Sequence, residues 1–117
     1  IPKKMLSSLG MILVQNRNRR TGNRRTLQIA EVTDDGNERV IMQHDSKKDT
    51  LEKVAASKYI IEEIELYTGM SKQEIMKNLK EKEAILKWMV DEDIDDIDKV
   101  GKVMANYYMG RLKVPSQ

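Results

Sequence analysis

The sequence pattern changes near residue 57, and this change restricts the possible folds more than any other feature. Short apolar runs separated by polar turns fill the first half, a pattern typical of strands. Apolar residues at helical spacing, preceded by helix-capping residues, fill the second half. We therefore predict an α+β chain. A small antiparallel sheet of three or four strands occupies residues 1–56, and a three-helix C-terminal unit occupies residues 57–117.

Three strands are predicted, at residues 10–16, 24–33 and 39–43. The first is a continuous apolar run, so we expect it to be buried on both faces. Asp35 and Gly36 favour a hairpin turn between the second and third strands. Residues 45–56 leave two alternatives open, because Asp49 and Glu52 fit a helical capping box while residues 50–54 also fit a fourth strand.

Three helices are predicted, at residues 57–68, 72–90 and 95–109. Ser57 is the expected cap of the first helix, and Gly69 follows its end. Ser71 and Glu74 form an S-x-x-E capping box at the start of the second helix. The residues expected in the core of the sheet are residues 11–14, Leu27, Ile29, Val40 and Met42. Those expected at helix contacts are Ile64, Ile75, Leu79, Leu86, Trp88, Met89, Val100, Met104 and Tyr107.

The composition excludes several kinds of site. The 117 residues include no cysteine, which rules out a disulfide framework, a thiolate metal site and a cysteine nucleophile. The longest unbroken apolar run is four residues, 11–14, whereas a membrane span needs roughly 20. We therefore expect a soluble, cytoplasmic chain. Because it begins at Ile1 rather than Met, we also expect an upstream portion.

Motif searches give no complete catalytic site. The P-loop pattern G-x-x-x-x-G-K-[ST] and the dinucleotide pattern G-x-G-x-x-G are both absent from the sequence. His44 is the single histidine, so histidine triads and multi-histidine metal sites are excluded, and we expect it at a strand end or on the surface. The acidic stretch 91–98 fails the EF-hand pattern, so helix capping is predicted there rather than metal binding.

Positive charge gathers at the front of the chain, where residues 1–30 hold seven basic residues and no acidic residue. Five of these are arginines around one predicted turn: Arg17, Arg19, Arg20, Arg24 and Arg25. Guanidinium groups bind phosphates and carboxylates with two parallel hydrogen bonds. The cluster is compatible with a nucleic-acid contact, with a contact to nucleotide phosphate or to the acids of a neighbouring subunit, or with a solvated hairpin end.

The order of these segments resembles the C-terminal region of the secretion-type traffic ATPases, with the archaeal archaellum and secretion motors as the nearest branch. Residues 1–6 resemble the family's I-P-x-x-M-L segment, and residues 24–32 resemble its R-R-x-x-x-I-x-E-V strand, with Gly22 in the preceding turn. Residues 49–54 resemble a strand before a Ser-capped helix, which favours the fourth strand. Residues 69–74 match the G-[LM]-S-x-x-E junction between two helices.

This resemblance implies the distal part of a RecA-like ATPase domain followed by a C-terminal helical unit. It implies a homohexameric motor for protein secretion or for archaellum or type IV pilus assembly, cytoplasmic and peripheral at the membrane. Its partners would be the other subunits and a polytopic inner-membrane platform protein, with no role for nucleic acid. The intact protein would use ATP and Mg²⁺, whereas the P-loop lysine and metal-site acids have no counterpart in residues 1–117, so no catalytic or metal-binding residue is carried over.

By the same resemblance, Arg20, Arg24, Arg25 and Glu31 are candidates for a nucleotide-facing or subunit-interface site. Two other functions remain open on the residues alone. One is a stand-alone nucleic-acid-binding module that uses the arginine-rich hairpin, and the other is a structural adaptor whose Met-rich helical face docks a partner helix.

Overall fold

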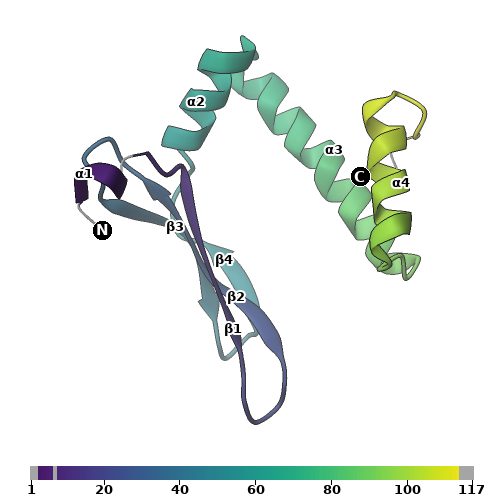
Figure 1. Ribbon diagram of the computed structural model, residues 1–117, viewed down its shortest axis with the longest axis horizontal. Helices are drawn as coiled ribbons and strands as arrows, with labels where there is room; N and C mark the ends of the chain where they lie inside the picture. The colour runs from purple at the N-terminus through teal and green to yellow at the C-terminus, as the bar shows by residue number, and fades with distance from the viewer. Residues whose placement is uncertain (1–2, 7, 114–117) are drawn as a thin grey trace. The chain divides into compact units, whose positions relative to one another are not determined.

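A computed structural model describes residues 3–6 and 8–113 and confirms the α+β architecture (Figure 1). A short helix α1 (Lys3–Leu6) precedes a four-stranded antiparallel sheet in the order β1-β2-β3-β4. The strands are β1 (Met11–Arg17), β2 (Arg24–Val32), β3 (Glu38–Asp45) and β4 (Thr50–Lys53). Three helices follow, α2 (Tyr59–Thr68), α3 (Lys72–Asp91) and α4 (Ile97–Tyr108). Ile1 and Pro2 of the I-P-x-x-M-L segment lie outside the described residues.

The fourth strand resolves the ambiguity of residues 45–56 in favour of a strand. β4 pairs with β3 from Asp45↔Thr50 to Met42↔Lys53. Asp49 does not start a helix; it has a φ of 53° and closes the turn between the two strands. Asp45 builds that turn, because its Oδ1 atom accepts hydrogen bonds from the backbone N–H groups of Lys47 and Lys48 at 2.9 and 3.1 Å.

The chain forms two compact units, residues 1–69 and residues 70–117. The first unit therefore contains α2 together with the sheet, whereas the sequence placed a boundary between residues 56 and 57. Its buried apolar residues lie on β2, β3 and α2: Ala30, Val32, Ile41 and Ile61. Because Ala30, Glu31 and Val32 are consecutive and all buried, both faces of β2 are covered at its end.

The expected burial of β1 is wrong. Met11, Leu13 and Val14 are 48%, 48% and 40% exposed. The apolar run suggested an internal strand, yet β1 lies at the sheet edge and pairs with β2 alone. On β3, Val40 and Met42 were expected in the core but are only half-buried, whereas their neighbour Ile41 is buried.

In the second unit, α3 and α4 form an antiparallel helical hairpin (Figure 1). Ser71 caps α3 as predicted, and its Oγ atom accepts a hydrogen bond from the Glu74 N–H at 3.2 Å. The hydroxyl of Tyr107 on α4 donates to Oε2 of Glu81 on α3 at 3.1 Å. This bond and burial raise the pKa of Tyr107, burial being the larger cause.

The buried face of α3 consists of Ile75, Ile85 and Met89. Leu79 and Leu86 were expected at helix contacts, but they are 45% and 57% exposed. Ile85 and Met89 are four residues apart and share a face, and Leu86 is rotated by about 100° from Ile85. Leu79 and Leu86 lie closer to the direction of Ile75, so helical phase alone does not account for their exposure. Among residues 3–6 and 8–113, no helix has the length and apolarity needed to cross a bilayer.

Candidate functional site at the arginine tip

The turn between β1 and β2 is held in shape by its own polar side chains. Asn18 organises it, because its Oδ1 atom accepts hydrogen bonds from the backbone N–H groups of Arg20 and Thr21 at 2.8 and 3.2 Å. The Asn18 carbonyl accepts from the Gly22 N–H at 2.7 Å, and Gly22 has the positive φ of 76° that suits glycine. A side chain that bonds its own turn in this way fixes the local backbone. The turn therefore presents its arginines from a defined framework.

Four arginines around this turn have exposed side chains, and we call them the arginine tip: Arg17, Arg19, Arg20 and Arg24. Within the part of the chain that the structure describes, none of their guanidinium groups makes an ion pair or hydrogen bond. Arg17 and Arg24 are direct cross-strand partners, so they project from the same face of the hairpin. Like charges directly opposite each other in a sheet are destabilising. The tip therefore carries a repulsion that an anionic partner would relieve.

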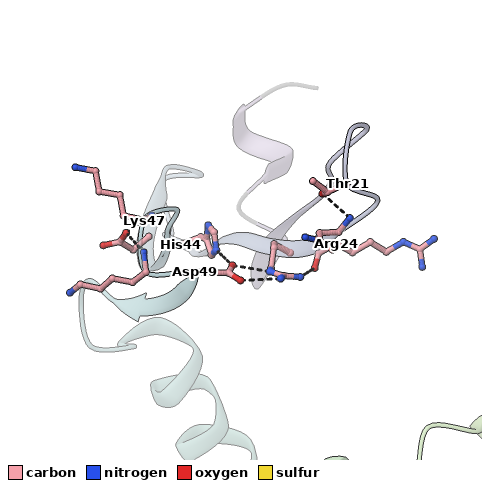
Figure 2. A network of polar contacts seen from close by, with 9 residues as sticks. Thr21, Arg24, His44, Lys47 and Asp49 are labelled. Atoms are coloured by element: carbon pink, nitrogen blue, oxygen red, sulfur yellow. Dashed lines mark hydrogen bonds and ion pairs between the residues drawn. The ribbon is translucent and has the colours of Figure 1, made fainter.

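Arg25 differs from its neighbour Arg24, because adjacent residues of a strand project from opposite faces. Its Nε and Nη2 atoms donate to Oδ1 and Oδ2 of Asp49 at 2.8 and 2.9 Å. His44 Nε2 lies 2.9 Å from the same Oδ1 atom. Figure 2 shows this network, with the Arg24 side chain directed away from the Asp49 carboxylate. Asp49 thus ties the β1–β2 hairpin to the β3–β4 turn.

The pKa of Asp49 is held well below its ordinary value, chiefly by the hydrogen bonds from Arg25 and His44. The same carboxylate raises the pKa of Arg25. Arg25 lies 24 residues from Asp49 in the sequence, and His44 lies five residues away. Arg25 is therefore a positioning residue in this site, and its charge is already matched within the chain.

Glu31, the fourth predicted site residue, is completely buried at the other end of β2. Its Oε2 atom accepts hydrogen bonds from the Ser57 hydroxyl at 2.6 Å and from the Ile60 N–H at 2.9 Å. The Lys58 N–H donates to both of its oxygens, at 3.0 and 3.1 Å. Nη1 of Arg39 donates to Oε1 at 2.9 Å. The carboxylate therefore caps α2 from a neighbouring strand, and we call these contacts the Glu31 clamp.

The prediction that Ser57 caps α2 is wrong in its details. Ser57 does not cap α2 directly; the N-cap residue is Lys58, which has no side-chain cap of its own. Burial by itself would raise the pKa of Glu31. The backbone N–H groups of Ile60 and Lys58, the Ser57 hydroxyl and Arg39 together outweigh burial and lower the pKa. A carboxylate at a helix N-terminus also interacts favourably with the helix dipole.

The structure thus separates the four predicted site residues into three positions. Arg20 and Arg24 lie on the exposed arginine tip, Arg25 is paired with Asp49 on the opposite face, and Glu31 is a buried anchor. Sequence reasoning did not identify Asp49 and Arg39 as members of these networks. The pairs Arg25–Asp49 and Glu31–Ser57 are separated by 24 and 26 residues, so no local pattern marks them.

The acidic stretch 91–98 includes the end of α3, the connection at residues 92–96 and the start of α4. Asp96 caps α4, as the capping prediction required, and its Oδ1 atom accepts from the Asp98 N–H at 3.0 Å. Across the described ranges 3–6 and 8–113, no group of three or more acidic or histidine side chains is arranged to hold a metal ion.

Comparison with known proteins shows a similarity to part of a longer archaeal protein. No protein-family profile matches the chain. Among curated proteins, the chain is similar to the uncharacterized protein MJ0781 of Methanocaldococcus jannaschii, with 27% identity over 122 residues that cover 97% of this chain. The chain spans 17% of the length of that protein. The similarity aligns the chain with part of a much longer archaeal protein and assigns no function by itself.

Proposed function

We propose that this chain is the C-terminal part of an oligomeric ATP-driven motor for protein secretion or for archaellum or type IV pilus assembly. In that motor it contributes subunit packing rather than catalysis. The observation that carries the proposal is the arginine tip, a prebuilt cationic surface whose four guanidinium groups have no partner among the described residues. A subunit interface is a natural place for such a surface, because complementary charge fixes the register of neighbouring subunits.

Two further observations support the same proposal. The segments that resemble the traffic ATPases form strands and helices in the order that the resemblance implies, including the strand before α2 and the capped start of α3. The similarity to one sixth of a long archaeal protein is compatible with a chain that works within a larger protein. The RecA-like origin of the sheet is part of this proposal.

In the proposed motor, ATP and Mg²⁺ bind outside residues 1–117, where a P-loop and acidic residues position the phosphates. The subunits form a homohexamer in the cytoplasm and contact a polytopic inner-membrane platform protein. Phosphoryl transfer needs positioned phosphate-binding groups and a metal ion. A chain of residues 1–117 alone should therefore be inactive.

The test uses the complete gene product. We expect it to hydrolyse ATP in the presence of Mg²⁺ and to form a hexamer. Replacing both Arg20 and Arg24 by Ala should lower the rate of hydrolysis and weaken the hexamer, because both exposed charges are removed. The matched control is Arg111→Ala, which removes an exposed arginine from the other unit. A complete gene product without ATPase activity would overturn the motor proposal.

The alternative function is nucleic-acid binding, and the same four arginines favour it. Residues 10–54 contain no Phe, Tyr or Trp, so His44 is the single aromatic ring that the sheet sequence offers for base stacking. Fluorescence anisotropy with labelled single-stranded and double-stranded DNA distinguishes the two functions. A phosphate-binding module loses affinity steeply as salt rises. The motor proposal predicts weak binding that does not depend on Arg24.

A further inference from the structure

We propose that the arginine tip of one copy docks on the acidic connection between α3 and α4 of a second copy. This inference rests on the proposed function, because it names the contact through which the subunits associate. We call the acidic connection the acidic turn and define it by six residues: Asp91, Glu92, Asp93, Asp95, Asp96 and Asp98.

The arginine tip needs a partner with several negative charges. Arg17 and Arg24 lie opposite each other on one face, and Arg19 and Arg20 extend from the turn between them. Asp49 neutralises Arg25 but faces away from this group. The carboxylates of Asp34, Asp35 and Glu38 follow the other end of β2. Among the described residues, no acidic side chain forms an ion pair with the four tip arginines.

The acidic turn has the complementary properties. All six acidic residues are exposed, and within residues 3–6 and 8–113 none of them forms an ion pair. Its backbone is fixed by hydrogen bonds from the Glu92 N–H to the Trp88 carbonyl at 3.0 Å and from the Ile94 N–H to the Met89 carbonyl at 2.8 Å. Both surfaces are therefore held in place before they meet, which reduces the entropy lost on binding.

The geometry of such a contact suits an oligomer. The tip and the acidic turn are different surfaces, so their contact is head-to-tail, and head-to-tail contacts generate rings when the rotation closes. Exposed charge pairs are screened by salt, with a Debye length of about 8 Å at 0.15 M. The association should therefore weaken as salt rises.

Charge reversal on each surface provides the test. The tip variant carries Arg20→Glu and Arg24→Glu. It should fold, because residue 24 then offers a carboxylate to Arg17. The turn variant carries Glu92→Lys and Asp95→Lys, and it leaves the Asp96 cap intact. Sedimentation velocity on the 117-residue chain and on the complete gene product measures association at low and at high salt.

We expect each variant alone to associate at least about tenfold more weakly than the parent chain, because like charges now meet. A mixture of the two variants should associate again, since the native tip of one variant can meet the native acidic turn of the other. A fluorophore on one variant identifies these mixed species. Association of either variant at the parental strength, or no association in the mixture, would overturn the proposed contact.

The outcomes separate this inference from the motor proposal. If the complete gene product hydrolyses ATP as a hexamer that the tip variant weakens and the turn variant leaves unchanged, the contact is wrong and the motor proposal stands. If the mixture associates while the complete gene product has no ATPase activity, the contact stands and the function is wrong. Tight, salt-sensitive DNA binding that the tip variant loses would assign the arginines to nucleic acid instead.

Discussion

The two units of this chain are stabilised in different ways. The sheet unit combines a small apolar core with one buried charge, because the Glu31 carboxylate accepts hydrogen bonds from β3, from the connection before α2 and from the start of α2. The helical hairpin depends on apolar packing, with Ile75, Ile85 and Met89 as its buried residues. A buried charge tolerates loss of its partners poorly, whereas apolar packing loses stability in proportion to the volume removed. Substitutions can therefore change the stability of the sheet unit and the stability of the helical hairpin separately.

Replacing Glu31 by Ala should give the largest effect. It leaves the first N–H groups of α2 without their acceptor and leaves Arg39, which is partly exposed, with the Ala56 carbonyl alone. We expect a loss of about 4 kcal/mol, because several hydrogen bonds to one buried carboxylate are removed together. Urea unfolding followed by amide NMR signals measures the change in the sheet unit. Trp88 is the single tryptophan and lies in the helical hairpin, so its fluorescence reports that unit alone.

The control for this change is Glu38→Ala, which removes an exposed carboxylate from β3. It should alter the unfolding free energy of the sheet unit by less than about 0.5 kcal/mol. An equal shift of the Trp88 transition in the Glu31 variant would contradict the separation of the two units.

Replacing Ile85 by Ala should give the next largest effect, now in the helical hairpin. Ile85 is completely buried, and such a truncation costs about 3 kcal/mol. The neighbouring change Leu86→Ala is the matched control, because Leu86 is 57% exposed and should cost far less. The Trp88 transition measures both. Equal losses from the two variants would mean that the helical phase of α3 is wrong.

Acidification should give a smaller effect than removing Glu31, because protonation discharges the carboxylate but leaves the side chain in place. The folded-state pKa of Glu31 lies below its unfolded value. Its contribution to stability is therefore complete above the unfolded pKa, about 4.3, and is lost as the pH falls through the folded pKa. The Asp49 carboxylate acts in the same direction.

Glu31→Gln removes the titrating group and keeps the shape. In this variant the stability of the sheet unit should depend less on pH below about 5 than it does in the parent chain. Urea midpoints measured between pH 7 and pH 3 provide the comparison. An unchanged pH dependence would show that Glu31 does not govern acid unfolding.

Local signals predicted the elements of this fold because each depends on neighbouring residues. The Asp35-Gly36 turn, the Ser71 capping box and Gly69 after α2 all act within a few residues. Burial was harder to predict. The run at residues 11–14 has the composition of an internal strand, but strand order, which depends on the whole sheet, places β1 at the edge.

The candidate site shows the same limit. The arginine cluster is visible in the sequence because its members are close together, and Arg20 and Arg24 are exposed as a surface site requires. The role of Arg25 depends on Asp49, 24 residues away, and the role of Glu31 depends on residues 26 to 29 positions later. Such pairings follow from topology, so a charge pattern alone cannot separate a free arginine from a paired one.

The Glu31 clamp also has a consequence for how the sheet unit folds and opens. The first turn of α2 lacks a side-chain cap from its own N-cap residue, and a helix of ten residues is marginal in isolation. The acceptor for the first N–H groups of α2 is Glu31 on β2, which lies 27 residues before Lys58. The segment between them must therefore close into a loop before these hydrogen bonds can form. The start of α2 is therefore stable only when the sheet has formed. We therefore expect β2 and α2 to unfold as one cooperative segment. The rate of amide hydrogen exchange along α2 should then depend on the unfolding of β2.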